Sequence, residues 1–297
     1  MSKNSTNVRL LSGLLSMVGA VSPRAAGRLA FELFCTTGKR RRPRFTPRPD
    51  RMERVRVGRQ RVATYAWDGG GPTVVLVHGW NGGAGDLAGF IAPLRDAGRR
   101  VVAVDLPAHG RSSGKRLTLA AAVDAVDAVL RREPAVEAVI AHSFGVPATV
   151  LAAGRGAPLP RAVLLSGPAS MEPYLQRFEQ VLGLGPSVRA AMRARVRRVL
   201  DERGLETMEL TAVAPRLAGR ALVIHDRADR EVPFLSAQAL HREWPGAELL
   251  ATDGLGHRRI LSDPAVIERA VRFAVKWDRP AMEKAASSER GLQLVAS

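Results

Sequence analysis

The sequence is poor in cysteine and has no long apolar run, and each shortage excludes a class of structure. Cys35 is the only cysteine among 297 residues, so the chain can form no internal disulfide and no cysteine-cluster metal site. No apolar run reaches the roughly 18 residues that a membrane-spanning helix needs. Apolar residues still make up 46% and charged residues 25% of the chain, which excludes global disorder.

Acidic residues are scarce in the N-terminal part. Residues 1–61 hold 15 Lys or Arg against three acids, whereas the other 236 residues hold 30 basic and 25 acidic ones. The net charge of +17 is therefore mainly a property of this N-terminal arm. The Pro-interrupted basic segment 38–50 is typical of an extended linker. Nucleic-acid binding through the arm is an alternative, although Phe45 is its only interleaved aromatic residue.

Two apolar stretches with helical spacing precede this linker. Residues 10–21 and 24–35 predict two amphipathic helices. They fit packing on the body of the protein, a secretion signal, or peripheral contact with an anionic membrane. The positive charges from Lys39 to Arg42 oppose export. We expect packing and a cytoplasmic protein, and membrane contact through residues 1–50 stays open as the alternative.

After residue 50, short β-rich runs alternate with stretches of helical length. Nearly continuous apolar runs such as VVLV and VVAV are typical of strands that are covered on both faces. The alternation predicts an α/β fold with a mostly parallel, eight-stranded sheet and helices on both faces. We expect strands at 52–57, 60–66, 73–77, 100–104, 136–141, 161–165, 220–224 and 247–251, and helices at 86–97, 117–132, 144–154, 236–243 and 263–276.

Local signals set some of these boundaries. Thr118 and Ser262 stand where helix caps are needed, and Asp263-Pro264 suits a first helical turn. Residues 165–220 show helical periodicity without a clear strand, which predicts a helical cap inserted between the sixth and seventh strands. The expected units are N-terminal helices and linker at 1–50, a core in two parts at 51–166 and 220–279, the cap at 167–219 and a loosely held tail at 280–297.

A serine stands at a turn from a strand to a helix. The strand 136–141 leads into Ala141-His142-Ser143-Phe144-Gly145, and a helix follows. A strained turn of this kind exposes the serine oxygen, and the helix start adds free backbone N–H groups and a positive dipole end. Taken alone, the pentapeptide also fits a serine that is a plain helix cap.

Other polar residues follow neighbouring strands. The strand 220–224 leads into HDRADREVP, and the strand 247–251 leads into GLGH, which ends at His257. Active residues collect at the carboxyl ends of strands in such sheets. His78-Gly79-Trp80 closes the strand 73–77, so the backbone N–H groups of Trp80 and Phe144 could form an oxyanion hole.

These segments together resemble the α/β-hydrolase family, and in particular its small bacterial serine esterases and lipases. The resemblance implies that Ser143 is the nucleophile, Asp229 the acid and His257 the base. Asp229 is preferred because the family acid precedes a Val-Pro pair by three residues, and Asp226 stays as the alternative. The segments that carry the resemblance, all within residues 51–279, are HGW at 78–80, DLPAHGRSSG at 105–114, AHSFG at 141–145, HDRADREVP at 225–233 and GLGH at 254–257.

Two positions depart from the family pattern. Ala141 and Ala108 stand where the family usually has glycine. One extra methyl at the start of the serine turn is tolerable, and the turn at Ala108 shapes a pocket wall without doing chemistry. The position after the strand 161–165, where some relatives carry the acid, holds Ser166.

The remaining histidines have positional interpretations. His78 and His142 are the candidate substrate-binding residues: His78 also holds the oxyanion loop, and His142 lines the site beside the nucleophile. We expect His109 to hold its turn, His225 to end a buried strand and His241 to lie on an exposed helix. No pair of ligands has metal spacing, so we expect no metal.

The resemblance implies acyl transfer to water from a small-molecule ester. His257, oriented by Asp229, would take the proton from Ser143, which attacks the carbonyl carbon, and no cofactor is needed. Trp80, Phe144, Leu175 and Phe178 could line an apolar acyl pocket, although core packing explains the last two equally well. An acyltransferase, a carbon–carbon bond hydrolase and a non-catalytic binding protein on the same fold are the alternatives.

Overall fold

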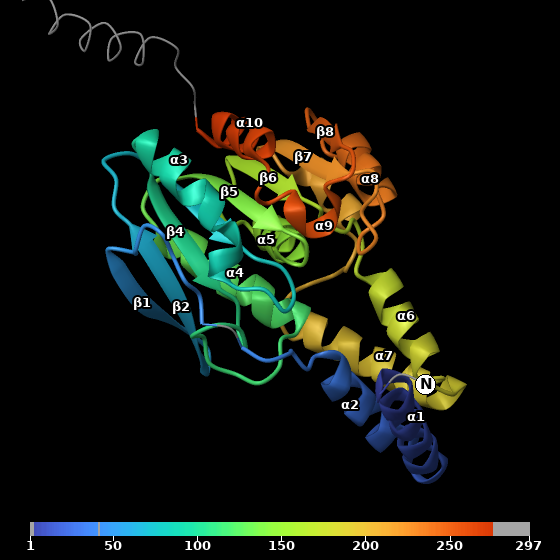
Figure 1. Ribbon diagram of the computed structural model, residues 1–297. Coiled ribbons are helices and arrows are strands. Elements are labelled where there is room, and N and C mark those ends of the chain that lie inside the picture. Colours follow the sequence, from blue (N-terminus) through green and yellow to red (C-terminus); the bar gives the residue numbers. More distant parts are fainter. Residues whose placement is uncertain (1–2, 41, 276–297) are drawn as a thin grey trace, which may run out of the picture.

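The computed structural model describes residues 3–40 and 42–275, so the tail expected at 280–297 lies outside the described residues. One eight-stranded sheet forms the centre of the molecule, in the order β1-β2-β4-β3-β5-β6-β7-β8 (Figure 1). β1 and β2 pair antiparallel, β2 also pairs antiparallel with β4, and all later pairs are parallel. The strands are β1 Arg51–Val57, β2 Gln60–Trp67, β3 Thr73–Val77, β4 Arg100–Asp105, β5 Val136–His142, β6 Arg161–Leu165, β7 Arg220–Asp226 and β8 Glu248–Thr252.

The central strands are buried on both faces because each face carries its own layer of helices. In β3, Val75 and Val77 belong to one apolar cluster, whereas Val74 and Leu76 belong to the other. Successive side chains of a strand point to opposite faces, so an unbroken apolar run fills both layers. The first layer holds α4 Leu119–Arg132, α5 Gly145–Gly154 and α8 Leu235–Glu243, and the second holds α3 Ile91–Asp96 and α10 Pro264–Ala274.

The expected strands are confirmed to within one or two residues, and the sheet is mostly parallel as predicted. Thr118 caps α4 by accepting a hydrogen bond from the Ala121 N–H at 3.0 Å. Ser262 is not a cap, because Asp263 accepts the N–H of Val266 at 3.0 Å and begins α10 instead.

Two helical stretches differ from the expectation. The helix expected at 86–97 is a 3₁₀ helix, Ala84–Phe90, followed by the short α3. The four-residue helix α9, Gly256–Arg259, was not expected, and it carries His257. A stretch this short leaves no helical period in the sequence by which it could be found.

Four helices form a layer at one end of the sheet that we call the lid. The cap between β6 and β7 supplies α6 Glu172–Val181 and α7 Pro186–Asp201, and two short 3₁₀ helices follow at Leu210–Ala212 and Ala214–Arg216. The N-terminal helices α1 Lys3–Val21 and α2 Pro23–Phe34 lie against these cap helices (Figure 1).

Glycine allows the N-terminal helices to approach the cap closely. A Cβ atom added at Gly27 of α2 would lie 2.6 Å from the Ala191 Cβ of α7, and one added at Gly19 of α1 would lie 2.6 Å from a methyl of Val188. The N-terminal segment therefore packs on the body of the protein as expected, and the part that it contacts is the cap.

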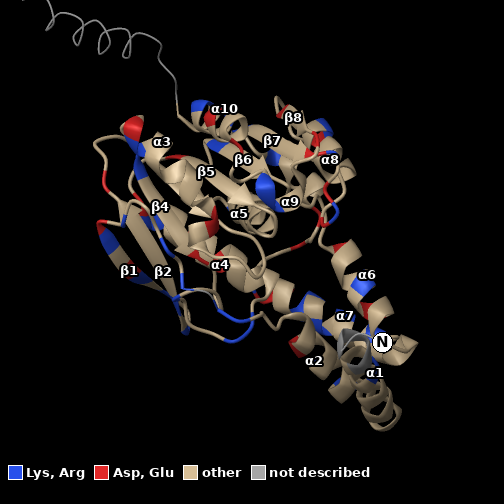
Figure 2. Ribbon diagram, viewed as in Figure 1, with Lys and Arg blue, Asp and Glu red and all other residues tan. Residues whose placement is uncertain are grey.

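Figure 2 shows basic residues along the linker that joins α2 to β1 and on the lid.

Candidate active site

Ser143 lies directly after β5, at the turn into α5. Its φ of +52° is left-handed, a conformation that costs a residue with a side chain about 1–3 kcal/mol and that is held by the surrounding structure. Two glycines allow this turn: Gly145, two residues after the serine, and Gly79, in the loop after β3. A Cβ at Gly145 would lie 2.5 Å from the Val77 carbonyl oxygen, and one at Gly79 would lie 2.7 Å from the Ser143 Cβ.

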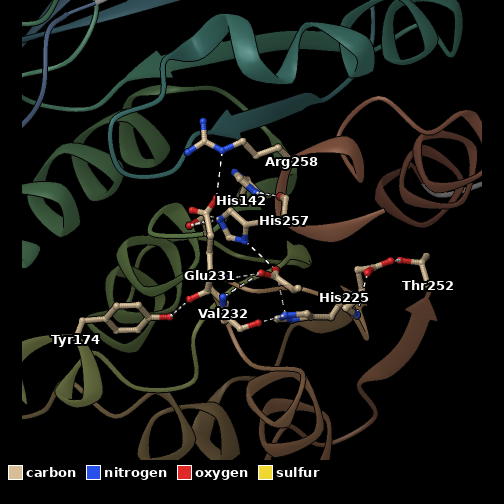
Figure 3. A network of polar contacts seen from close by, with 12 residues as sticks. His142, Tyr174, His225, Glu231, Val232, Thr252, His257 and Arg258 are labelled. Atoms are coloured by element: carbon tan, nitrogen blue, oxygen red, sulfur yellow. Dashed lines mark hydrogen bonds and ion pairs between the residues drawn. The ribbon is translucent and has the colours of Figure 1, made fainter. Parts of the chain in front are cut away.

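Ser143, His257 and Asp229 meet at the carboxyl ends of their strands. The Ser143 Oγ–H donates to His257 Nε2 at 3.0 Å, and the His257 Nδ1–H donates to Asp229 Oδ2 at 2.8 Å. Figure 3 shows His257 close to His142 and Glu231 within a network of polar contacts that also includes His225 and Val232. A serine, a histidine and an aspartate joined by hydrogen bonds in this order can activate a hydroxyl as a nucleophile.

The two aspartates of the segment after β7 have different surroundings. Asp229 contacts His257, whereas Asp226 accepts hydrogen bonds from Thr252 Oγ1 at 2.8 Å and from the Leu255 N–H at 2.9 Å. Asp226 thereby joins β8 to the loop that leads to His257. Among the described residues, only the Asp229 carboxylate forms an ion-pair contact with the Nδ1 atom of this histidine.

Asp229 is held as a buried carboxylate. Burial opposes its ionisation, but hydrogen bonds from His225, from His257 and from the backbone N–H groups of Val232 and Glu231 outweigh burial and hold the pKa of Asp229 well below its ordinary value. The two backbone donors lie 3.0 and 2.8 Å from Oδ1. A carboxylate with this many donors keeps its charge and stabilises a positive histidine beside it.

His225 is a second histidine beside the acid, and sequence reasoning assigned it only to the end of a buried strand. Its Nε2–H donates to the Val232 carbonyl at 2.9 Å, and the same nitrogen lies 3.4 Å from Asp229 Oδ2 (Figure 3). Its Nδ1 is buried and has no hydrogen-bond partner among the described residues. The four-residue spacing to Asp229 was the available signal, and the turn after β7 brings the two side chains together.

The backbone N–H groups of Trp80 and Phe144 are the expected oxyanion donors. Neither N–H group makes a hydrogen bond to another described residue, and both residues line the same cavity as Ser143. The two aromatic rings contact each other at a centroid distance of 5.3 Å. Free N–H donors beside a nucleophile can stabilise the oxyanion of a tetrahedral intermediate.

The two candidate substrate-binding histidines differ. His142 lines the cavity, and its Nε2–H donates to the His257 carbonyl at 2.9 Å. His78 is fully buried and does not line the cavity: its Nδ1–H donates to the Gly79 carbonyl at 2.7 Å, and its Nε2 accepts the Leu106 N–H at 3.0 Å. The expected substrate contact of His78 is therefore corrected to the loop-holding role alone.

Burial keeps three histidines around the site neutral. Desolvation, with the nearby His257 as a second cause, lowers the pKa of His142 to about 3. Desolvation likewise lowers the pKa of His109 to about 4, and it lowers the pKa of the fully buried His78. His109 holds its turn as expected, because its Nδ1–H donates to the Pro107 carbonyl and its Nε2 accepts the Asn81 N–H, both at 3.0 Å.

A cavity of about 1160 Å³ opens from Ser143 toward the lid. Trp80, Phe144, Leu175 and Phe178 all line it, as expected for an acyl pocket. Helix α2 also forms a wall of this cavity, which the sequence did not predict. Its Phe34 ring meets the Phe178 ring of α6 edge-on, at a centroid distance of 5.2 Å. The apolar lining from the lid consists of Phe31, Leu33 and Phe34 of α2, Leu175, Phe178 and Val181 of α6, and Val196, Val199 and Leu200 of α7.

Glu231 and Arg258 form an ion pair beside His257. The Glu231 carboxylate lies 3.7 Å from His257 Nε2 and 3.3 Å from Arg258 Nε. Tyr174 of α6 donates to the Glu231 carbonyl at 3.4 Å, which joins the lid to the loop that carries Asp229 (Figure 3).

Residues 3–40 and 42–275 contain no cluster of three His, Cys, Asp or Glu residues that could hold a metal, and no helix among them is long and apolar enough to span a membrane.

Solved structures with the same fold include several esterases. Pf2001 from Pyrococcus furiosus matches with a TM-score of 0.63 at 18% identity, over 81% of this chain and 99% of that one. Est1E from Butyrivibrio proteoclasticus, solved with ferulic acid, gives 0.58 at 20% identity over 74% and 96%. RhEst1 from Rhodococcus sp. ECU1013 gives 0.56 at 21% identity over 75% and 98%.

Sequence comparison gives a family but no individual relative. No curated protein sequence matches the chain. The sequence profile of the alpha/beta hydrolase family matches residues 74–270, which include Ser143, Asp229 and His257. The chain belongs to the alpha/beta hydrolase family.

Proposed function

We propose that this protein is a serine hydrolase that cleaves carboxylic esters through Ser143, His257 and Asp229. The observation that carries the proposal is the unbroken chain of two hydrogen bonds from the serine hydroxyl to the buried aspartate, 3.0 and 2.8 Å long. The fold shared with solved esterases is consistent with it.

Each residue has a defined task in the proposed reaction. His257 Nε2 takes the proton of Ser143 as its oxygen attacks the ester carbonyl carbon, and Asp229 stabilises the imidazolium that forms. The N–H groups of Trp80 and Phe144 receive the oxyanion. The imidazolium protonates the leaving alcohol, and an acyl-enzyme remains. The same histidine then activates a water molecule, which releases the acid and restores the serine.

The cavity favours esters with a substantial apolar acyl group. Its apolar lining from α2, α6 and α7 begins next to Ser143 and continues under the lid. Burying an alkyl chain contributes about 0.8 kcal/mol for each methylene removed from water. We therefore expect kcat/KM for p-nitrophenyl esters to rise from acetate to medium-length chains.

The test is the Ser143→Ala variant, assayed on p-nitrophenyl esters of graded chain length. Activity should fall by a factor of about 10³ or more, and a fluorophosphonate probe should label the wild type only. Ser236→Ala on α8 is the matched control and should keep full activity. Retention of more than a tenth of the activity in Ser143→Ala would refute the proposal. If the wild type transfers the acyl group to an added alcohol in preference to water, the enzyme is an acyltransferase.

A further inference from the structure

The outer face of α1 carries a row of apolar side chains that nothing in the described structure covers. Leu10, Leu14, Met17 and Val21 are 68, 43, 67 and 89% exposed. Their spacing of four, three and four residues places them on one side of the helix. They extend over about 16 Å of its length at 1.5 Å per residue. We call these four residues the α1 stripe.

The opposite side of α1 holds the helix on the lid. Leu15 is buried, and Leu11 and Val18 pack against the main apolar cluster. The helix is therefore fixed in place with its apolar stripe turned outward. Figure 1 shows α1 at the outer end of the lid, away from the sheet, where a flat surface can reach it.

Exposed apolar side chains are concentrated in this part of the molecule. The described residues expose seven large apolar side chains, and five of them lie on the lid. The fifth, Val181 of α6, also lines the cavity that leads to Ser143. Apolar groups gathered on one region mark an interaction surface, whereas scattered ones do not. The seven are Leu10, Leu14, Met17, Val21 and Val181 on the lid, and Met52 and Leu235 elsewhere.

The positive charge of the lid indicates that the surface bound by the α1 stripe is negatively charged. The helices α1, α2, α6 and α7 together hold ten basic and four acidic residues, a net charge of +6, and α1 itself has no acidic residue. Arg9, Arg24 and Arg177 are exposed and have no acidic partner among the described residues. A second copy of the chain would bring an equally positive lid, so like charges oppose that pairing.

We propose that the α1 stripe docks the lid on an anionic lipid surface. An amphipathic helix with apolar side chains on one side and basic residues around it lies in the plane of a membrane interface with its apolar side in the acyl region. Basic residues near an anionic membrane add electrostatic attraction, which salt weakens. Docked in this way, the protein presents the lid, and with it the wall of the acyl cavity, to the lipid.

The experiment measures binding to vesicles of phosphatidylcholine with and without phosphatidylglycerol, by sedimentation of the full chain at physiological salt. The wild type should sediment with the anionic vesicles and much less with the neutral ones, and more salt should weaken binding. The triple variant Leu10→Ser, Leu14→Ser, Met17→Ser should bind at least about tenfold more weakly. The double variant Met52→Ser, Leu235→Ser, which changes exposed apolar residues elsewhere, should bind as the wild type does.

Each contrary outcome overturns the proposal. It fails if the wild type stays in solution with anionic vesicles, or if the triple variant sediments like the wild type. Equal binding to neutral and anionic vesicles removes the role of the basic lid. A wild type that elutes as a dimer, together with a monomeric triple variant, assigns the stripe to a second copy instead.

Binding and catalysis are measured separately, so the two proposals can fail independently. The stripe does not line the cavity, so the triple variant should hydrolyse a soluble short-chain ester at the wild-type rate. Because binding needs no turnover, Ser143→Ala should still sediment with anionic vesicles. Loss of soluble-ester activity in the triple variant would indicate a damaged fold, and vesicle binding would then be measured with Leu10→Ser alone. Weaker binding of Leu10→Ser supports the proposal, and binding equal to that of the wild type refutes it.

Discussion

At the scale of single residues, two aspartates three positions apart have separable roles. Asp229→Asn should lower kcat for ester hydrolysis by about 10³–10⁴-fold, because an amide cannot stabilise the imidazolium of His257 and favours the wrong tautomer. Asp226→Asn should lower kcat less than tenfold, since its amide oxygen can still accept from Thr252 and Leu255. The measurement is kcat on a p-nitrophenyl ester for both variants. The reverse order of losses would transfer the acid role to Asp226.

We expect His225 to act as a positioning residue for Asp229, because its Nε2 contacts both the Val232 carbonyl and Asp229. A hydrogen bond to a charged group contributes about 1.5–3 kcal/mol, so His225→Leu should lower kcat about tenfold to a hundredfold with little change in KM. His225→Gln, whose amide nitrogen can replace Nε2, should restore part of the rate. A merely structural role would appear as lower stability with kcat retained in both variants.

At the scale of the elements, α2 is expected to set acyl-chain preference although it lies far from Ser143 in the sequence. Phe34 lines the cavity and meets Phe178 edge-on, so Phe34→Ala should enlarge the pocket. The ratio of kcat/KM for long-chain over short-chain esters should rise about tenfold, while acetate hydrolysis stays near the wild-type rate. Leu29→Ala, on the same helix but outside the cavity lining, is the control. An unchanged ratio in Phe34→Ala would remove α2 from the specificity wall.

The helices show what a sequence can and cannot predict. The strands could be predicted because short, nearly continuous apolar runs that alternate with stretches of helical length are typical of strands covered on both faces. Asp263 could have been identified as the cap of α10. Proline favours the first position of a helix, so Pro264 indicates that the cap is the residue directly before it. The amphipathic pattern of α2 indicated that one face is covered but carried no information on what covers it. Its partner α7 lies more than 150 residues away, and only the fold brings the two together.

The candidate site was predictable to the same extent. Ser143, Asp229 and His257 stand in local motifs whose order along the chain is itself informative, and the structure brings these three side chains into contact. His225 begins the segment HDRADREVP, but the resemblance implied no role for it, because its contact with Asp229 depends on how the chain turns after β7. His78 was assigned to the substrate because it stands in a loop of the site, and burial of its ring within the fold excludes that contact.

At the scale of the whole molecule, three buried histidines make stability depend on pH. The pKa values of His142 and His109 are lowered to about 3 and about 4 by burial, and that of His78 is lowered as well. An unfolded histidine has a pKa of about 6.5, so below this pH the unfolded chain binds up to three more protons than the native one. The stability that these neutral groups provide is complete above pH 6.5 and is lost as the pH falls toward 4.

A histidine whose native pKa lies below this range contributes a slope of about 1.4 kcal/mol per pH unit, so His142 and His109 together should lower the free energy of unfolding by about 3 kcal/mol per unit between pH 6 and 4.5, and His78 acts in the same direction. Asp229, whose pKa is held low, acts in the same direction only nearer pH 4. Urea denaturation across this range measures the slope. His109→Asn keeps a donor for the Pro107 carbonyl and removes one titrating group, so its slope should be smaller by about 1.4 kcal/mol per pH unit. A midpoint that stays constant from pH 7.5 to 5 would show that these rings take up protons in the folded state.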